Sequence, residues 1–124
     1  MGEGYRQFDL EDRTYGFAKR CRDYSKMILK TQANVEYSRQ LIRASGSTAA
    51  NYIEANEAIS DKDFIFRIRI CRKEVKESRL WLKLTEPGKE KKVQEEQIYL
   101  VGEATELLKI FTSIINKKEK GKKN

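Results

Sequence analysis

The chain has 124 residues, of which 39% are hydrophobic and 36% are charged, and it carries a formal net charge of +7 at pH 7. This length allows one domain with a buried core, while a single proline and seven glycines favour a few long helices over a β-sandwich. No apolar run approaches the roughly 18 residues of a membrane span, and the first residues contain no apolar export segment. We therefore expect a cytoplasmic protein with no membrane partner, whose positive charge suits anionic partners.

The first two predicted helices each have one apolar face with spacings of three and four residues. The first begins at Asp9, a plausible N-cap, and its inward residues are Leu10, Thr14, Phe17, Cys21, Tyr24 and Ile28. The second runs from about Asn34 to Ile59, and its inward residues are Leu41, Ser45, Thr48, Tyr52, Ala55 and Ile59.

The segment SGSTAANYIEANEA, residues 45–58, is unusually rich in small side chains for a helix surface. A glycine inside a helix costs roughly 1 kcal/mol relative to alanine, so Gly46 between two serines leaves a loop as the alternative. A helical projection favours a helix that a neighbouring helix approaches closely, because the small residues gather on one side. That side comprises Ala44, Ser45, Thr48, Asn51, Tyr52 and Ala55.

The third and fourth predicted helices are separated by Pro87 and Gly88, which do not suit a helix interior. The third begins at Ser60, where the sequence SDKD resembles a capping box, and its inward residues are Phe64, Ile68, Cys71, Val75, Ser78 and Leu82. The fourth runs from about Lys91 to Asn116, and its inward residues are Val93, Leu100, Ala104, Leu107, Phe111, Ile114 and Ile115. The pattern predicts an all-α, antiparallel up-down-up-down four-helix bundle over residues 1–116, followed by a frayed basic tail over residues 117–124.

The third helix carries two further faces besides its inward one. A helix in a monomeric bundle needs one apolar stripe, but this helix has a second apolar strip, which we expect to form an oligomer interface and which comprises Phe66, Ile70, Trp81 and Leu84. Between the two apolar faces lies a basic band of Arg69, Arg72, Lys73, Lys76, Arg79 and Lys83.

The residues give little support to catalysis. The pairs Glu54 and Glu57, and Glu74 and Glu77, could suggest a di-iron site, but such sites use Glu-x-x-His twice and the chain has no histidine. We expect no metal, no cofactor and no enzymatic activity, and we expect these glutamates to pair with arginines or to cap polar groups. The two isolated cysteines, Cys21 and Cys71, are expected to be buried and reduced.

Residues 40–84, QLIRASGSTAANYIEANEAISDKDFIFRIRICRKEVKESRLWLKL, resemble a bacterial family of small four-helix-bundle proteins encoded in intervening sequences of 23S ribosomal RNA genes. The matching pieces include Ala50-Asn51, Glu54-Ala55, Asp63-Phe64-Ile65, Lys73-Glu74 and Trp81-Leu82. The resemblance implies a cyclic homo-oligomer, a pentamer, with no established activity. A distant branch, the accessory variability determinant proteins of diversity-generating retroelements, binds nucleic acid and a reverse transcriptase. Arg72 departs from the family pattern, in which relatives often show small apolar residues.

Two functions remain open. In the first, the protein binds RNA or DNA through phosphate contacts from the basic band and the lysines of the tail, which are Lys117, Lys118, Lys120, Lys122 and Lys123. In the second, it is a protein-interaction scaffold, or an accessory partner of a protein such as a reverse transcriptase. The excess of basic residues and the implied ring favour nucleic acid, because repeated weak sites gain avidity along a polyanion.

Overall fold

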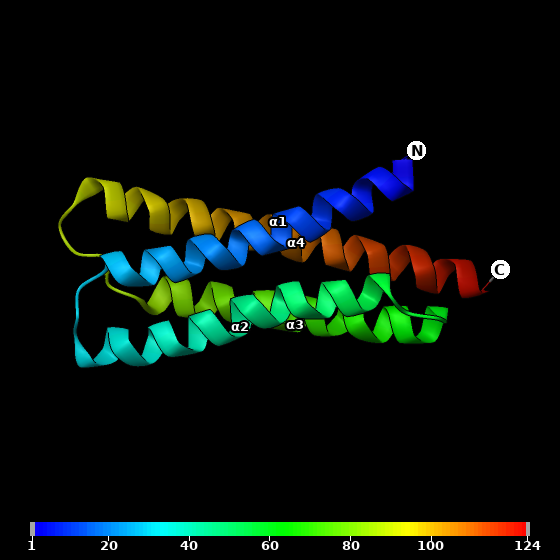
Figure 1. Cartoon of the computed structure of the whole chain (residues 1–124), viewed down its shortest axis with the longest axis horizontal. Coiled ribbons are helices and arrows are strands. Elements are labelled where there is room, and N and C mark those ends of the chain that lie inside the picture. The colour runs from blue at the N-terminus through cyan, green and yellow to red at the C-terminus, as the bar shows by residue number, and fades with distance from the viewer. Residues whose placement is uncertain (1, 124) are drawn as a thin grey trace.

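The computed structural model describes residues 2–123 of the chain, with side chains described for residues 10–121. It contains four helices, α1 (Gly2–Met27), α2 (Gln32–Asn56), α3 (Asp61–Leu84) and α4 (Lys91–Lys123), and residues 2–123 include no strand. Figure 1 shows an elongated bundle in which the chain turns back at each connection. Each helix packs against two others, and α2 and α3 share the most extensive contact. The predicted all-α four-helix bundle is confirmed, and none of the described helices is both long and apolar enough to cross a membrane.

Three predicted helix boundaries were wrong. The first helix begins at Gly2 rather than at Asp9, because the intervening Glu, Arg and Gln residues are good helix formers. The second helix ends at Asn56, and Ile59 is 95% exposed rather than inward-facing, because the residues before Ser60 form the connection to α3. The predicted frayed tail is helical as far as Lys123. Lysine is a good helix former, and cations stabilise a helix C-terminus.

The starts of α2 and α3 are fixed by side-chain caps. The Thr31 side chain accepts a hydrogen bond of 3.0 Å from the backbone N–H of Asn34. The Ser60 side chain accepts one of 3.1 Å from the backbone N–H of Asp63. The predicted start of the third helix is therefore confirmed, and each cap satisfies an N–H that the first helical turn leaves without a partner.

The core consists almost entirely of the predicted inward residues. In α3, Ile68, Cys71, Val75, Ser78 and Leu82 are fully buried, Ile65 is buried although it was not predicted, and Phe64 packs against the core only in part. Ile114 of α4 is likewise partly buried. The fully buried residues contributed by α1, α2 and α4 include Cys21, Tyr24, Leu41, Tyr52, Leu100, Leu107 and Phe111.

The small-residue segment is helical from Ser45 to Asn56, including Gly46, so the loop alternative is wrong. Ala44, Ser45 and Thr48 are buried, and the Thr48 hydroxyl donates to the Ala44 carbonyl at 2.9 Å. Gly46 is exposed, and a methyl group added there would have no neighbour within 4 Å. Close packing on this side therefore depends on the buried small residues and does not require Gly46.

The two ends of the bundle differ. At the end that carries the α1–α2 and α3–α4 connections, the buried Asn34 side chain donates to the Leu29 carbonyl at 2.9 Å and to the Glu86 carbonyl at 2.8 Å. It also accepts a bond of 2.9 Å from the Glu86 N–H. Next to it, the Tyr24 and Thr85 hydroxyls share a buried hydrogen bond of 2.8 Å. The opposite end carries only the α2–α3 connection and contains a cavity.

Candidate nucleic-acid interface and oligomer surface

The basic band of α3 lies beside α4. The Arg79 guanidinium donates to the Thr105 hydroxyl at 3.2 Å, and Arg69 forms an ion pair with Glu119. Both contacts join the band to α4, so the band borders the groove between these two helices. Among the six predicted residues, Arg72 and Arg79 are half-buried, while the exposed ones are Arg69, Lys73, Lys76 and Lys83.

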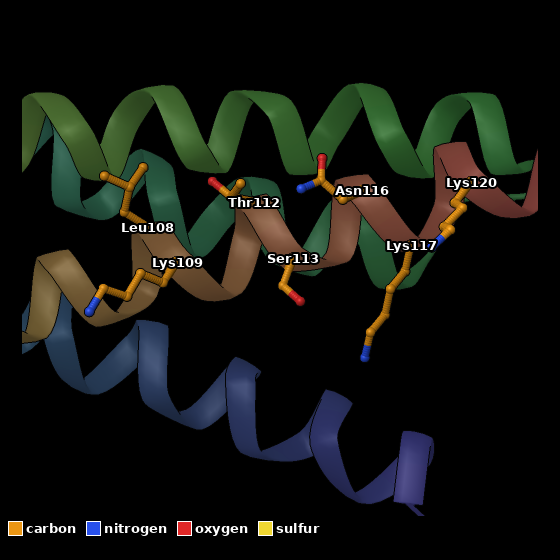
Figure 2. A pocket seen from close by; sticks show the side chains of 7 residues that line it. All are labelled: Leu108, Lys109, Thr112, Ser113, Asn116, Lys117 and Lys120. Atoms are coloured by element: carbon orange, nitrogen blue, oxygen red, sulfur yellow. The ribbon is translucent and has the colours of Figure 1, made fainter.

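The C-terminal part of α4 adds a second group of cations. Lys117, Lys118 and Lys120 are exposed, whereas the side chains of Lys122 and Lys123 lie outside the described residues. Figure 2 shows a shallow groove along this helix, in which Thr112 and Asn116 are directed toward α3 and Ser113 and Lys117 toward α1. The groove is lined by Leu108, Lys109, Thr112, Ser113, Asn116, Lys117 and Lys120. Its lining therefore consists mainly of neutral polar groups and lysines.

Several arginines on the other helices form ion pairs with glutamates. Arg13 pairs with Glu103 at 2.7 Å and Arg20 with Glu96 at 2.6 Å, and both pairs join α1 to α4. On α2, Arg43 contacts two glutamates of α3.

The Arg43 contacts reach Glu74 at 3.4 Å and Glu77 at 3.2 Å. The prediction that the four glutamates pair with arginines is confirmed for Glu74 and Glu77, whereas Glu54 and Glu57 form no such pair among residues 10–121. By contrast, Lys73, Lys76 and Lys83 have no acidic partner among residues 10–121.

The second apolar strip of α3 is unevenly exposed. Phe66 is 58% exposed and Leu84 is 41% exposed, whereas Ile70 and Trp81 are half-buried. Trp81 packs against the core of its own bundle and stacks on Tyr37, with ring centroids 6.2 Å apart. Trp81 therefore has a packing role within the chain, and Phe66 and Leu84 present most of the free apolar surface of the strip.

Other exposed apolar side chains were not predicted. On α4, Ile98 is 71% exposed and Tyr99 lies beside it under the Arg20 guanidinium, 3.9 Å from the ring centroid. On α2, Val35, Ile42 and Ile53 are also exposed. Only the inward faces of α2 and α4 were predicted from the sequence, and a helical projection of their outward faces would have identified these positions.

The described residues give little support for covalent or metal chemistry. Cys21 and Cys71 are free and buried, as expected, and burial raises the pKa of each thiol from 9.0 to about 12, so neither is a thiolate near neutral pH. No group of three or more potential metal-ligating side chains occurs within the described part of the chain.

Comparison with known proteins identifies the family. The sequence pattern of the family described as 23S rRNA-intervening sequence protein matches residues 6–113. Among solved structures, the chain is similar to a protein of unknown function from the S23 ribosomal protein family of Bacteroides thetaiotaomicron. The two are 32% identical with a TM-score of 0.72, and the match covers 85% of this chain and 96% of the other. The comparison with curated proteins gave no match. The chain therefore belongs to the 23S rRNA-intervening sequence protein family.

Proposed function

We propose that this protein is a non-enzymatic, antiparallel four-helix bundle that assembles as a homopentamer and binds nucleic acid through the basic surface of α3 and α4. The observation that carries the proposal is the grouping of unpaired lysines on two neighbouring helices. Lys73, Lys76 and Lys83 of α3 are exposed and have no acidic partner among the described residues, and α3 packs against α4, where Lys117 and Lys120 are exposed as well. Phosphates can supply the missing counter-charge.

Such a surface supports affinity without sequence recognition. Lysine contacts to phosphates release condensed counterions, so binding weakens steeply as salt rises, and they carry no information about base identity. Several copies of the surface on a cyclic oligomer would bind one strand with avidity. RNA and DNA are therefore both expected ligands.

The experiment compares the parent chain with the double variant Lys73→Glu/Lys76→Glu by fluorescence anisotropy with labelled RNA and DNA at about 50 and 200 mM salt. We expect several-fold weaker binding and a shallower salt dependence for the variant, because two phosphate contacts become repulsive. The double variant Lys19→Glu/Lys26→Glu makes the same charge change on exposed residues of α1 and serves as a control. Helicity and oligomer size should be unchanged in both.

Equal binding by the parent and by the α3 variant would contradict this proposal. The second candidate is a protein-interaction scaffold, and the exposed apolar side chains of Phe66 and Ile98 favour it. In that case the positive charge would maintain solubility or attract an acidic protein, and nucleic acid would play no direct part.

A further inference from the structure

The end of the bundle with the α2–α3 connection contains a cavity of about 870 Å³, which falls within the roughly 300–1,000 Å³ of small-molecule sites. Parts of all four helices line it, together with the α2–α3 connection. Its apolar walls are formed by Leu10, Tyr52, Ala55, Phe64, Ile110 and Ile114. Lys117 and Lys118 of α4 also line this cavity, but the basic band of α3 does not, and phosphate contacts alone leave the apolar walls unexplained.

A polar atom in the wall of the cavity lacks a partner. Asn56 is the last residue of α2 and lines the cavity, and its buried side-chain oxygen Oδ1 accepts no hydrogen bond within the described part of the chain. The Tyr52 hydroxyl interacts with the same side chain and leaves Oδ1 without a donor. A buried acceptor without a partner is unfavourable, and a small rotation of the Asn56 side chain toward the cavity would let a ligand N–H group satisfy it.

The mouth of the cavity combines an aromatic face with two lysines. The Lys118 ammonium lies 5.2 Å from the centroid of the Phe64 ring and 3.4 Å from an Asp61 carboxylate oxygen. Lys117 also lines the mouth, and it has no acidic partner among residues 10–121. An aromatic face accepts a stacked base, and lysines at the rim attract a phosphate.

We propose that this cavity binds one nucleotide. On binding, the Asn56 side chain turns toward the cavity, and Lys118 moves off the Phe64 ring and away from Asp61. The base stacks on Phe64 and donates an N–H to Asn56 Oδ1, while its phosphate contacts Lys117 and Lys118. An acyl chain would leave the Asn56 acceptor unsatisfied, and a cationic ligand would be repelled by the lysines. Because the bases all carry N–H donors on their Watson–Crick edges, one acceptor gives little selectivity among them. The nucleotide is either a free molecule or one residue of a single-stranded nucleic acid. Only the second case rests on the proposed function, which is nucleic-acid binding.

The first experiment titrates the full chain with AMP, ribose 5-phosphate and adenosine, and follows backbone amide resonances by NMR. We expect AMP to shift the resonances of Ala55, Phe64 and Ile114, and to bind at least roughly tenfold more tightly than either fragment, because only AMP supplies both base stacking and phosphate contacts. The proposal is overturned if AMP leaves these resonances unchanged, or if ribose 5-phosphate binds as tightly as AMP.

Substitutions inside the cavity separate base recognition from general charge attraction. Asn56→Leu keeps a similar shape but removes the acceptor, and should weaken AMP binding roughly tenfold while the free protein unfolds at the same or a higher temperature. Ala58→Trp, in the α2–α3 connection, should fill the mouth and abolish binding. Lys117→Gln should weaken binding, whereas Lys109→Gln, on the same helix outside the cavity, should not. Parent-like AMP affinity in folded Asn56→Leu and Ala58→Trp variants overturns the proposal.

A last comparison identifies the source of the nucleotide, using single-stranded and duplex RNA of equal length. If the nucleotide belongs to a strand, Ala58→Trp should weaken single-strand binding and leave duplex binding unchanged. If it is free, Ala58→Trp should abolish AMP binding alone. The variant Lys73→Glu/Lys76→Glu should weaken RNA binding and leave AMP binding intact. Failure of AMP binding therefore overturns the cavity proposal alone, and parent-like RNA binding by the α3 variant overturns the phosphate-contact proposal alone.

Discussion

Asn34 shows how one buried polar side chain can fix the geometry of two connections. Its amide and carbonyl groups make three hydrogen bonds, all to backbone atoms of Leu29 and Glu86. Leu29 and Glu86 are distant in sequence and belong to different connections. Both connections are thereby held at one end of the bundle, and the buried backbone groups there are satisfied.

We predict that Asn34→Ala lowers the free energy of unfolding by about 2–4 kcal/mol, because it leaves two carbonyls and one N–H of the connections without partners. Urea denaturation followed by circular dichroism measures the change. Asn116→Ala, at an exposed position of α4, is the matched control and should change the free energy by less than about 0.5 kcal/mol. Similar values for the two variants would show that Asn34 does not stabilise this end.

At the scale of the helices, the sequence was sufficient to predict the four elements and nearly all of the core, because the apolar spacing of three and four persists along each helix. The exact ends were harder to predict. The last turns of α4 are helical although they contain no core residues, and they contact α3 through Arg69–Glu119 and Lys118–Asp61. Such contacts cannot be predicted from the residue spacing along a single helix, because they depend on which helices are neighbours in the bundle. The same holds for the cavity near Asn56, whose lining residues are scattered over the whole chain.

Gly46 provides a test of the α2 helix. It lies in the middle of the helix, is exposed, and has room for a methyl group. We predict that Gly46→Ala raises the free energy of unfolding by about 0.5–1 kcal/mol, because alanine favours the helix and restricts the unfolded chain. Thermal and urea unfolding measure this effect. A loss of stability accompanied by a smaller particle in light scattering would instead place Gly46 at a contact between subunits.

For the molecule as a whole, charge and apolar surface are distributed on different faces. The basic band of α3 borders α4 through Arg79 and Thr105, whereas Trp81 of the apolar strip contacts Tyr37 of α2. A ring uses two different patches of each subunit, so assembly through the strip could leave the basic band free. A cyclic oligomer would then present one basic surface for each copy of the chain.

The final prediction concerns this assembly. Light scattering should give a particle several times the mass of the 14.5 kDa chain, because an exposed apolar strip is unusual on a soluble monomer. The family resemblance sets the expected number at five copies. Trp81→Glu is expected to disturb the bundle itself, since Trp81 packs against its core. Phe66→Glu is therefore the sharper variant, and should reduce the particle to smaller species while helicity is retained. Tyr15→Glu, at a 64% exposed position of α1, makes the same kind of change away from the strip and should leave the particle intact. A monomeric parent protein at micromolar concentration would refute both the ring and the role of the strip.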